Sequence, residues 1–146
     1  MKFLIIGLGS MGQRRIRNLQ SLNVGEIVGF DLREDRRKES EEKFGIQTIE
    51  DIQQVNLKDF DAWIISTPPA IHNQYIKLAI EHRKPAFVEA SVILAGLEEL
   101  QQSAQSNNIL IASSCTLRFH PAIKEIKRIV KDKTYGNVTN FSYHIG

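Results

Sequence analysis

Short apolar runs alternate with longer amphipathic segments along most of this chain. The apolar runs are continuous rather than broken by polar residues, which is typical of parallel strands that are buried on both faces. They predict strands at Phe3–Ile6, Ile27–Phe30, Ala62–Ile65, Ala86–Val88 and Ile109–Ala112, with a weaker strand near Gln47–Ile49.

The segments between these runs carry apolar residues at helical spacing. They predict helices at Ser10–Leu22, Asp35–Phe44, Ala70–Lys84 and Ala95–Asn107, and at most a short helix at Glu50–Val55. In the first of them, Ile16, Leu19 and Leu22 would form the buried face. Regular strand–helix alternation favours an α/β fold, a doubly wound (Rossmann) and mostly parallel sheet of about six strands flanked by helices.

The pattern changes near Pro121. A helix is expected to begin there, followed by a turn, and Val138–Ile145 then alternates apolar and polar positions like a half-buried strand. Such a strand needs a partner, so we expect either that Gly146 is not a natural domain end or that the strand pairs with another chain. A small appendage folded back on the sheet is the alternative.

Three glycines stand immediately behind the first predicted strand. They lie in the run Gly7–Gly12 (G-L-G-S-M-G), and Asp31 ends the next apolar run at the distance of a ribose-binding acid. Strand, glycine loop and helix in this order are typical of a site that holds a pyrophosphate at a helix N-terminus. A glycine-rich turn of some other α/β protein is the alternative. The candidate cofactor-binding residues here are Gly7, Gly9, Ser10, Met11, Gly12 and Asp31.

The choice of dinucleotide depends on Asp31 and on the arginines that follow it. A carboxylate accepts the ribose 2′-hydroxyl and repels a 2′-phosphate, which favours NAD over NADP. Arg33, Arg36 and Arg37 could attract that phosphate, or they could form a solvated, salt-bridged helix start. We expect NAD as the cofactor, with Arg33 among the residues that bind it.

Further candidates follow the later strands, because ligands of such sheets bind beyond the carboxyl ends of the strands. Ser66, Thr67 and Pro68 end the fourth apolar run, and Thr67 could instead only cap the next helix. His72 follows them, as a cofactor contact or as an ordinary surface or capped histidine. Glu89 ends the fifth run, as a ribose ligand or as a salt-bridged carboxylate.

The last candidates surround the end of the sixth run. Arg118 could bind a substrate carboxylate or hydroxyl, and His120 is a weak candidate for the proton acceptor. Cys115 is expected to be a small core residue rather than a nucleophile. No metal site is predicted.

Composition narrows the class of protein. The 146 residues are 42% hydrophobic and 25% charged, as in an ordinary globular domain. The net charge of +2 is too small to indicate binding to nucleic acid or a membrane surface. No apolar stretch approaches the length of a membrane span, and a single cysteine fits a reducing compartment. A cytoplasmic location is therefore expected.

Taken together, the motifs resemble the glucose–fructose oxidoreductase, inositol dehydrogenase and MocA (Gfo/Idh/MocA) family. The matching stretches are Gly7–Gly12, Asp31, Thr67–His72, Glu89, Arg118–Pro121 and Tyr135–Val138. The resemblance implies an NAD(P)-binding Rossmann domain over residues 1–120. It implies that residues 121–146 are the linking helix and first strand of an otherwise absent C-terminal domain that carries substrate contacts and oligomer interfaces.

Such proteins oxidise or reduce sugars and polyols, so the resemblance implies an NAD-dependent oxidoreductase that is a homo-oligomer when full length. One position departs from the family. Members usually follow the strand-five glutamate with a catalytic lysine, and this chain has Ala90. The alternative is therefore a non-catalytic dinucleotide-binding sensor or regulatory protein, and this chain alone is expected to be inactive.

Overall fold

The computed structural model describes residues 1–91, 93–142 and 144. The chain forms two compact units, Met1–Ser114 and Cys115–Gly146, and each is described by itself. No helix in the described ranges is long and apolar enough to cross a membrane. Over the same ranges, no group of three or more His, Cys, Asp or Glu side chains is arranged to hold a metal ion.

The first unit is built on a six-stranded sheet with the order β3-β2-β1-β4-β5-β6. Each neighbouring pair runs parallel. The strands are β1 (Lys2–Ile6), β2 (Glu26–Phe30), β3 (Gln47–Ile49), β4 (Ala62–Ile65), β5 (Ala86–Val88) and β6 (Ile111–Ser113). The predicted α/β doubly wound fold is confirmed. The last strand begins at Ile111 rather than Ile109 because the backbone N–H of Ile109 still bonds to Ala104, in the preceding helix.

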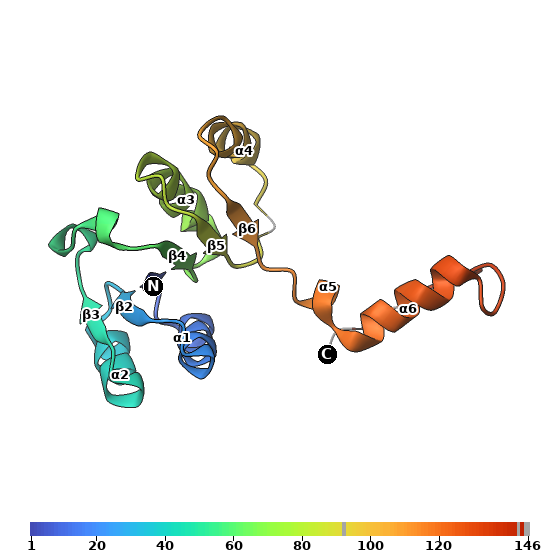
Figure 1. Ribbon diagram of the computed structural model, residues 1–146, viewed down its shortest axis with the longest axis horizontal. Coiled ribbons are helices and arrows are strands. Elements are labelled where there is room, and N and C mark those ends of the chain that lie inside the picture. The colour runs from blue at the N-terminus through green and yellow to red at the C-terminus, as the bar shows by residue number, and fades with distance from the viewer. Residues whose placement is uncertain (92, 143, 145–146) are drawn as a thin grey trace. The chain divides into compact units, whose positions relative to one another are not determined.

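Helices cover both faces of this sheet (Figure 1). They are α1 (Ser10–Leu22), α2 (Glu34–Phe44), α3 (His72–Glu81) and α4 (Leu97–Ser106). Alternate residues of one strand feed two separate cores. Leu4 and Ile6 pack with Tyr75 and Ile76 of α3, whereas Ile5 packs with Ile16 of α1. Burial of the strands on both faces explains their continuous apolar runs.

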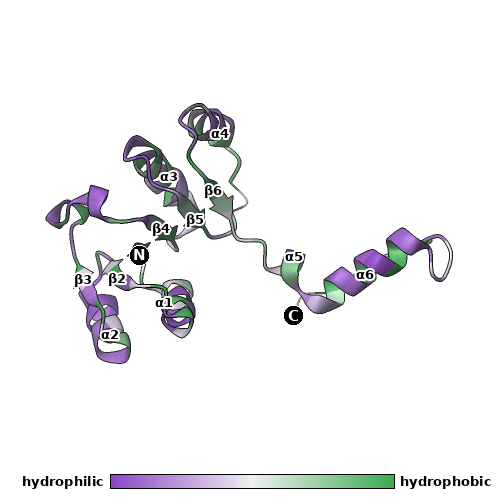
Figure 2. Cartoon of the chain, in the orientation of Figure 1, coloured by the Kyte–Doolittle hydropathy of each residue, from purple (hydrophilic) through white to green (hydrophobic). Residues whose placement is uncertain are grey.

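The charged helix α2 lies at the outside of the first unit and is drawn largely hydrophilic in Figure 2. The predicted burial of Leu22 is wrong. Leu22 is 69% exposed, because α1 ends there with Asn23 in a left-handed conformation. The segment Glu50–Val55, expected to be at most a short helix, holds a 3₁₀ turn, Ile52–Gln54, which the Asp51 carboxylate caps.

The strand order creates a switch point between β1 and β4. From β1 the chain continues outward to β2 and β3, and from β4 it continues the other way to β5 and β6. The loops after β1 and β4 therefore diverge and leave a crevice at the carboxyl edge, where ligands of such sheets bind. The backbone N–H of Ser66, just after β4, still donates to Ile6 of β1 at 2.7 Å, so both loops start at the same level.

The second unit contains α5 (Thr116–Phe119) and α6 (Pro121–Asp132). Helix α6 begins at Pro121, as predicted, and hydrophobic and hydrophilic residues alternate along it (Figure 2). The predicted strand Val138–Ile145 is wrong for residues 138–142 and 144, which have no strand structure, while Tyr143 and Ile145 lie outside the described residues. The pattern marks the side that a strand could bury, but a ladder also needs a neighbouring strand to accept and donate hydrogen bonds.

Candidate functional site

Two glycines, one in the loop after β1 and one in the first turn of α1, have backbone atoms too close to leave room for a Cβ. Gly7 adopts a φ of +94°, and a Cβ there would lie 2.8 Å from the carbonyl oxygen of Ser66. A Cβ on Gly12 would lie 1.9 Å from the carbonyl oxygen of Gly7. The backbone N–H of Gly7 donates to Phe30 at 2.8 Å, which ties the loop to β2. These glycines let the loop turn tightly and bring α1 close to the sheet.

Gly9 is different, because its open side faces a guanidinium group instead of backbone. The nearest atoms to a Cβ built on Gly9 belong to Arg36, at 3.6 Å or more. Helix α1 starts at Ser10 without a side-chain cap in the described structure and without acidic residues in its first turn. Its first N–H groups can therefore bind an anion. Ser10 and Met11, both exposed, stand at this helix start.

A hollow of about 320 Å³ opens beside this loop. It is lined by Leu8, Gly9, Ser10, Gln13, Arg33, Asp35, Arg36 and Glu39. Gln13 was not singled out by the sequence, although its place one turn after Ser10 on α1 could have indicated it. Its amide donates to Glu39 of α2 at 2.8 Å, so it joins the two helices behind the hollow.

Asp31 follows β2 and is 8% exposed. Its Oδ2 accepts the backbone N–H of Leu8 at 2.8 Å, and its Oδ1 accepts that of Arg33 at 2.9 Å. Nη1 of Arg36 lies 3.4 Å from Oδ2. A carboxylate offers about four acceptor positions, so Asp31 can hold the loop and still accept hydroxyl groups from a ligand.

A second hollow of about 190 Å³ adjoins Asp31. It is lined by Gly7, Phe30, Asp31, Leu32, Arg33, Arg36, Ser66, Thr67, Pro68, Ile71 and Tyr75. Oγ of Ser66 and Oγ1 of Thr67 are buried there, and neither has a hydrogen-bond partner among the described residues. The suggestion that Thr67 caps the following helix is therefore wrong. Pro69–Ile71 form a 3₁₀ turn before α3, so Thr67 lies too early to cap it.

His72 is buried and contacts the backbone of the turn that follows β4. Its side chain is 2% exposed, which corrects the alternative of a surface histidine. A ring nitrogen, Nε2, lies 2.7 Å from the carbonyl oxygen of Thr67. His72 therefore holds the Ser66–Pro68 turn in place through a backbone contact.

Tyr75, a buried residue of α3 that the sequence did not single out for the site, lines the second hollow. Its ring packs edge-on against Phe30, with the centroids 6.2 Å apart. Burial, with a smaller contribution from the charge of Asp31, raises the pKa of Tyr75. The phenol is thus a neutral hydrogen-bond donor at physiological pH. Its place one turn after His72 was the available sequence signal.

Glu89 follows β5 and forms an ion pair with α1. Its carboxylate accepts Nε of Arg15 at 2.6 Å and Nη2 at 3.0 Å, and both side chains are mostly buried. Arg15 also lies over the ring of Phe87, 4.9 Å from its centroid. Nη2 lies 3.4 Å from Oγ of Ser114. The structure therefore has the salt-bridged carboxylate, one of the two alternatives for Glu89, and Ala90 beside it is exposed.

Arg118 and His120 belong to the second unit, and their suggested substrate and catalytic roles stay predictions. Arg118 lies in the short helix α5, and Nδ1 of His120 accepts the backbone N–H of Ala122 at 3.2 Å to cap α6. Cys115 is exposed, so its expected place in a core is wrong. It directly precedes α5, at the start of the second unit.

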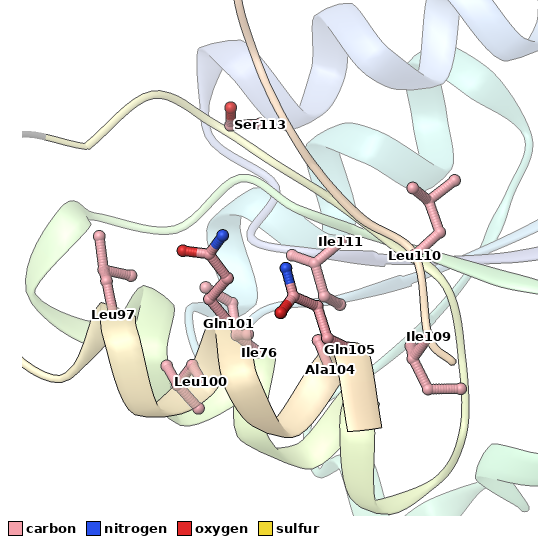
Figure 3. Close-up of a pocket in the computed structure, with 10 residues that line it drawn as sticks. All are labelled: Ile76, Leu97, Leu100, Gln101, Ala104, Gln105, Ile109, Leu110, Ile111 and Ser113. Carbon is pink, nitrogen blue, oxygen red and sulfur yellow. The ribbon is translucent and has the colours of Figure 1, made fainter. Parts of the chain in front are cut away.

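Another hollow in the first unit, of about 450 Å³, lies beside α4 and β6 (Figure 3). Its ten lining residues include Leu97, Leu100, Ile109 and Leu110, and none of the ten is ionisable. The glycine loop, Asp31 and the Ser66–Pro68 turn do not contribute to it. It has no charged group to orient a charged cofactor, so the candidate site is the pair of hollows beside the glycine loop.

These residues fit a dinucleotide in three independent respects. Gly9 leaves open space at an uncapped helix N-terminus, as a pyrophosphate requires. Asp31 keeps acceptor capacity beside it for ribose hydroxyls. The partnerless hydroxyl groups of Ser66 and Thr67 are buried polar atoms that a ligand could satisfy.

Comparison with known proteins agrees with this assignment. The family model GFO_IDH_MocA, described as an oxidoreductase family with an NAD-binding Rossmann fold, matches residues 1–114. A curated relative, myo-inositol 2-dehydrogenase of Thermotoga maritima, is 24% identical over 141 residues, which cover 93% of this chain and 42% of the relative. The chain thus spans about two fifths of the length of the curated relatives it matches.

Solved structures show the same fold. An oxidoreductase from Agrobacterium radiobacter, in complex with NAD+, L-tartaric acid and magnesium, has a TM-score of 0.82 at 20% identity. That match covers 94% of this chain and 42% of the other. The WlbA dehydrogenase from Chromobacterium violaceum, in complex with NADH and UDP-GlcNAcA, has a TM-score of 0.81 at 17% identity, covering 93% and 41%. The family resemblance expected from the sequence motifs is confirmed.

Proposed function

Because the chain belongs to the Gfo/Idh/MocA oxidoreductase family, we propose that it is the cofactor-binding part of an NAD-dependent dehydrogenase. The observation that carries this proposal is the connected arrangement of Gly9, the N-terminus of α1 and Asp31. It combines an anion site with a carboxylate that is hydrogen-bonded to the same loop, as the binding of a pyrophosphate and its adjoining ribose requires.

Each part of the site has a separate task in this proposal. The first N–H groups of α1, at Ser10 and Met11, bind the pyrophosphate, and Asp31 accepts the hydroxyl groups of the adenosine ribose. Ser66 and Thr67 satisfy their buried hydroxyl groups on the cofactor. NAD, when bound, supplies the hydride acceptor. The rigid Arg15–Glu89 pair fixes the ends of β5 and α1 on the other side of the switch point.

The proposed substrate is a polyol or a sugar-like alcohol. Support comes from the curated relatives, several of which are inositol 2-dehydrogenases. Arg118, through its guanidinium, and His120, through its ring, are the proposed contributions of the second unit to substrate binding and proton transfer. We propose that residues 1–120 form the cofactor domain and that residues 121–146 lead into the domain with the remaining substrate contacts.

We also propose that the full protein acts in the cytoplasm as a homo-oligomer. The single cysteine, Cys115, and the absence of spanning helices from the described ranges support the location. The oligomer rests on the family resemblance, which gives the second domain a role in subunit contacts. Size-exclusion chromatography with light scattering of the full protein tests it.

A second function, dinucleotide binding without turnover, is favoured by the surroundings of Glu89. The adjacent position carries Ala90, which has no proton to exchange, and Glu89 itself is committed to Arg15. A sensor or regulatory protein would need to bind the dinucleotide but would need no group that accepts a proton from a substrate. The two functions differ in whether the full protein reduces NAD+ when a polyol is present.

The experiment that tests the proposed function has two stages. The 146-residue chain is titrated with NADH, and binding is followed by energy transfer from Trp63, its only tryptophan, and by calorimetry. The full protein is then mixed with NAD+ and a panel of cyclic polyols and sugars, and the absorbance of NADH is followed. Binding with turnover supports the dehydrogenase, binding without turnover supports the sensor, and no binding contradicts both.

A further inference from the structure

Three arginines follow Asp31, and two of them have their guanidinium groups already engaged. Arg33 forms an ion pair with Asp35 through two nitrogens. Nη1 of Arg37 donates to the carbonyl oxygens of Asp31 and Leu32, and its Nη2 donates to Glu50. Asp35 thus occupies two of the five N–H donors of Arg33 and holds its guanidinium in an ion pair, and both terminal nitrogens of Arg37 are bound within the chain.

Arg36 has a different environment. Its one hydrogen bond within the described part of the chain is the long contact of 3.4 Å from Nη1 to Oδ2 of Asp31. A guanidinium carries five N–H donors, so most of its donors are unused. The side chain is 36% exposed, which leaves it within reach of solvent and of a ligand.

Arg36, like Arg33, lines both hollows, and Arg36 is also the nearest side chain to the open side of Gly9. Nη1, Cζ and Nη2 lie 3.6, 3.7 and 3.9 Å from the position that a Cβ would take on Gly9. The same group is next to Asp31. It therefore reaches both the expected place of the pyrophosphate and that of the ribose hydroxyls. A substituent on the ribose 2′-oxygen would lie near this guanidinium.

The negative charge of Asp31 is balanced by the positive charge of Arg36. A carboxylate alone would repel a 2′-phosphate, but Asp31 is paired with Arg36 and with two backbone N–H groups. A guanidinium matches a phosphate by donating two parallel hydrogen bonds, and it can do so while its net charge compensates Asp31.

We propose that Arg36 is the residue that admits a 2′-phosphate, so that this chain binds NADPH as well as NADH. The inference rests on the proposed dinucleotide site and concerns which of the two cofactors that site accepts. Asp31 supplies the hydroxyl acceptor for NADH, and Arg36 turns its unused donors to the 2′-phosphate of NADPH.

The test compares four proteins in titrations with NADH and NADPH. They are the unaltered chain, R36Q, R33Q and K38Q. Lys38 lies on the same helix and pairs with Glu34, so K38Q removes one positive charge without touching either hollow. R33Q examines the competing arginine. Circular dichroism and thermal unfolding verify that each variant is folded.

We expect the unaltered chain to bind NADPH within about tenfold of NADH. R36Q should weaken NADPH by about tenfold or more and NADH by less than about threefold, the loss expected for one or two charge-assisted hydrogen bonds. R33Q and K38Q should change the ratio of the two affinities by less than about threefold. Competition by 2′,5′-ADP, which carries the 2′-phosphate without a pyrophosphate, should weaken in R36Q, whereas competition by ADP-ribose should not.

Several outcomes would overturn the inference. An equal loss of NADH and NADPH in R36Q would place Arg36 on the pyrophosphate, and a selective loss of NADPH in R33Q would transfer the role to Arg33. NADH binding without NADPH binding by the unaltered chain contradicts the inference and leaves the proposed function intact. Failure to bind either dinucleotide contradicts both together.

Discussion

The backbone N–H of Leu8 donates a hydrogen bond of 2.8 Å to Oδ2 of Asp31. The residue expected to bind a ribose therefore also holds the glycine loop in position. This contact is buried and joins residues that are 23 positions apart. In the proposed site, one carboxylate would serve both folding and binding, and a substitution there should affect both.

Asp31→Ala should lower the free energy of unfolding by about 1–3 kcal/mol, because it leaves the buried N–H of Leu8 without a partner. Asp31→Asn should cost less, since its one amide oxygen can still accept that N–H. Urea unfolding of the two variants measures the difference. The control is Asp35→Ala, which removes an exposed carboxylate paired with Arg33. Equal stability of Asp31→Ala and the unaltered chain would contradict the coupling.

Gly9 and Gly12 should respond differently to the same added methyl group. Gly12→Ala places a Cβ against the carbonyl oxygen of Gly7 and should destabilise the fold by about 2 kcal/mol or more. Gly9→Ala has an ordinary φ of −68° and no contact closer than 3.6 Å, so the fold should persist. Its methyl group occupies the space for the pyrophosphate, and NADH affinity should fall by about tenfold or more.

Thermal unfolding and NADH titration of both glycine variants separate these effects. If Gly9→Ala binds NADH as tightly as the unaltered chain, the pyrophosphate does not approach Gly9 and the site assignment fails. Loss of stability in Gly9→Ala comparable to that in Gly12→Ala would instead show that the open side of Gly9 is needed for folding.

Much of the fold could be predicted because the apolar runs of the sequence are the segments that the sheet buries on both faces. The strand at Ile27–Phe30 and the helix from Ser10 were readable from apolar runs and the glycine loop, and both are found. The segment 138–145 carries an equally regular alternation, yet its described residues form no strand. Alternation specifies a face, whereas a strand also depends on a neighbour that the sequence does not identify.

The candidate site was predicted to the level of residues but not of contacts. Gly9 and Asp31 were singled out by their spacing within the glycine-loop pattern, and their contacts with a dinucleotide stay predictions. The partners of Glu89 and His72 could not be found this way. Arg15 is 74 positions from Glu89, and a ring nitrogen of His72 lies against the backbone carbonyl of Thr67. Only the folded backbone brings such groups together.

The Arg15–Glu89 pair should contribute measurably to stability. Arg15→Gln and Glu89→Gln each leave a mostly buried charge without its partner, so each should cost about 2 kcal/mol, between the values for exposed and fully buried pairs. The double variant should cost less than the sum, and a double-mutant cycle measures this coupling. The exposed pair Lys38–Glu34 serves as control, with a coupling of about 0.3 kcal/mol. Additive losses would show that the two charges do not interact.

Tyr75 should make stability sensitive to alkaline pH. Its pKa in the folded chain is raised, first by burial and then by Asp31, above the ordinary value of 10.0. The unfolded chain therefore loses this proton first as the pH rises past about 10, and the free energy of unfolding falls from there upward. Tyr75→Phe should show a shallower alkaline decline in urea unfolding. Tyr135→Phe, at a residue 86% exposed, should decline like the unaltered chain.

Ala90 provides a direct test of what limits catalysis. The resemblance places a lysine after the strand-five glutamate in catalytic members, and Ala90 is exposed beside the fixed Glu89. A lysine there has room for its side chain and would bring an ionisable group to the carboxyl edge of β5.

We expect Ala90→Lys in the full protein to raise the rate of NAD+ reduction with a polyol by about tenfold or more, the low end of general acid–base contributions. Ala90→Met, of similar length without a charge, should not. Equal rates in both variants and the unaltered protein would mean that another group, such as His120, already accepts the proton.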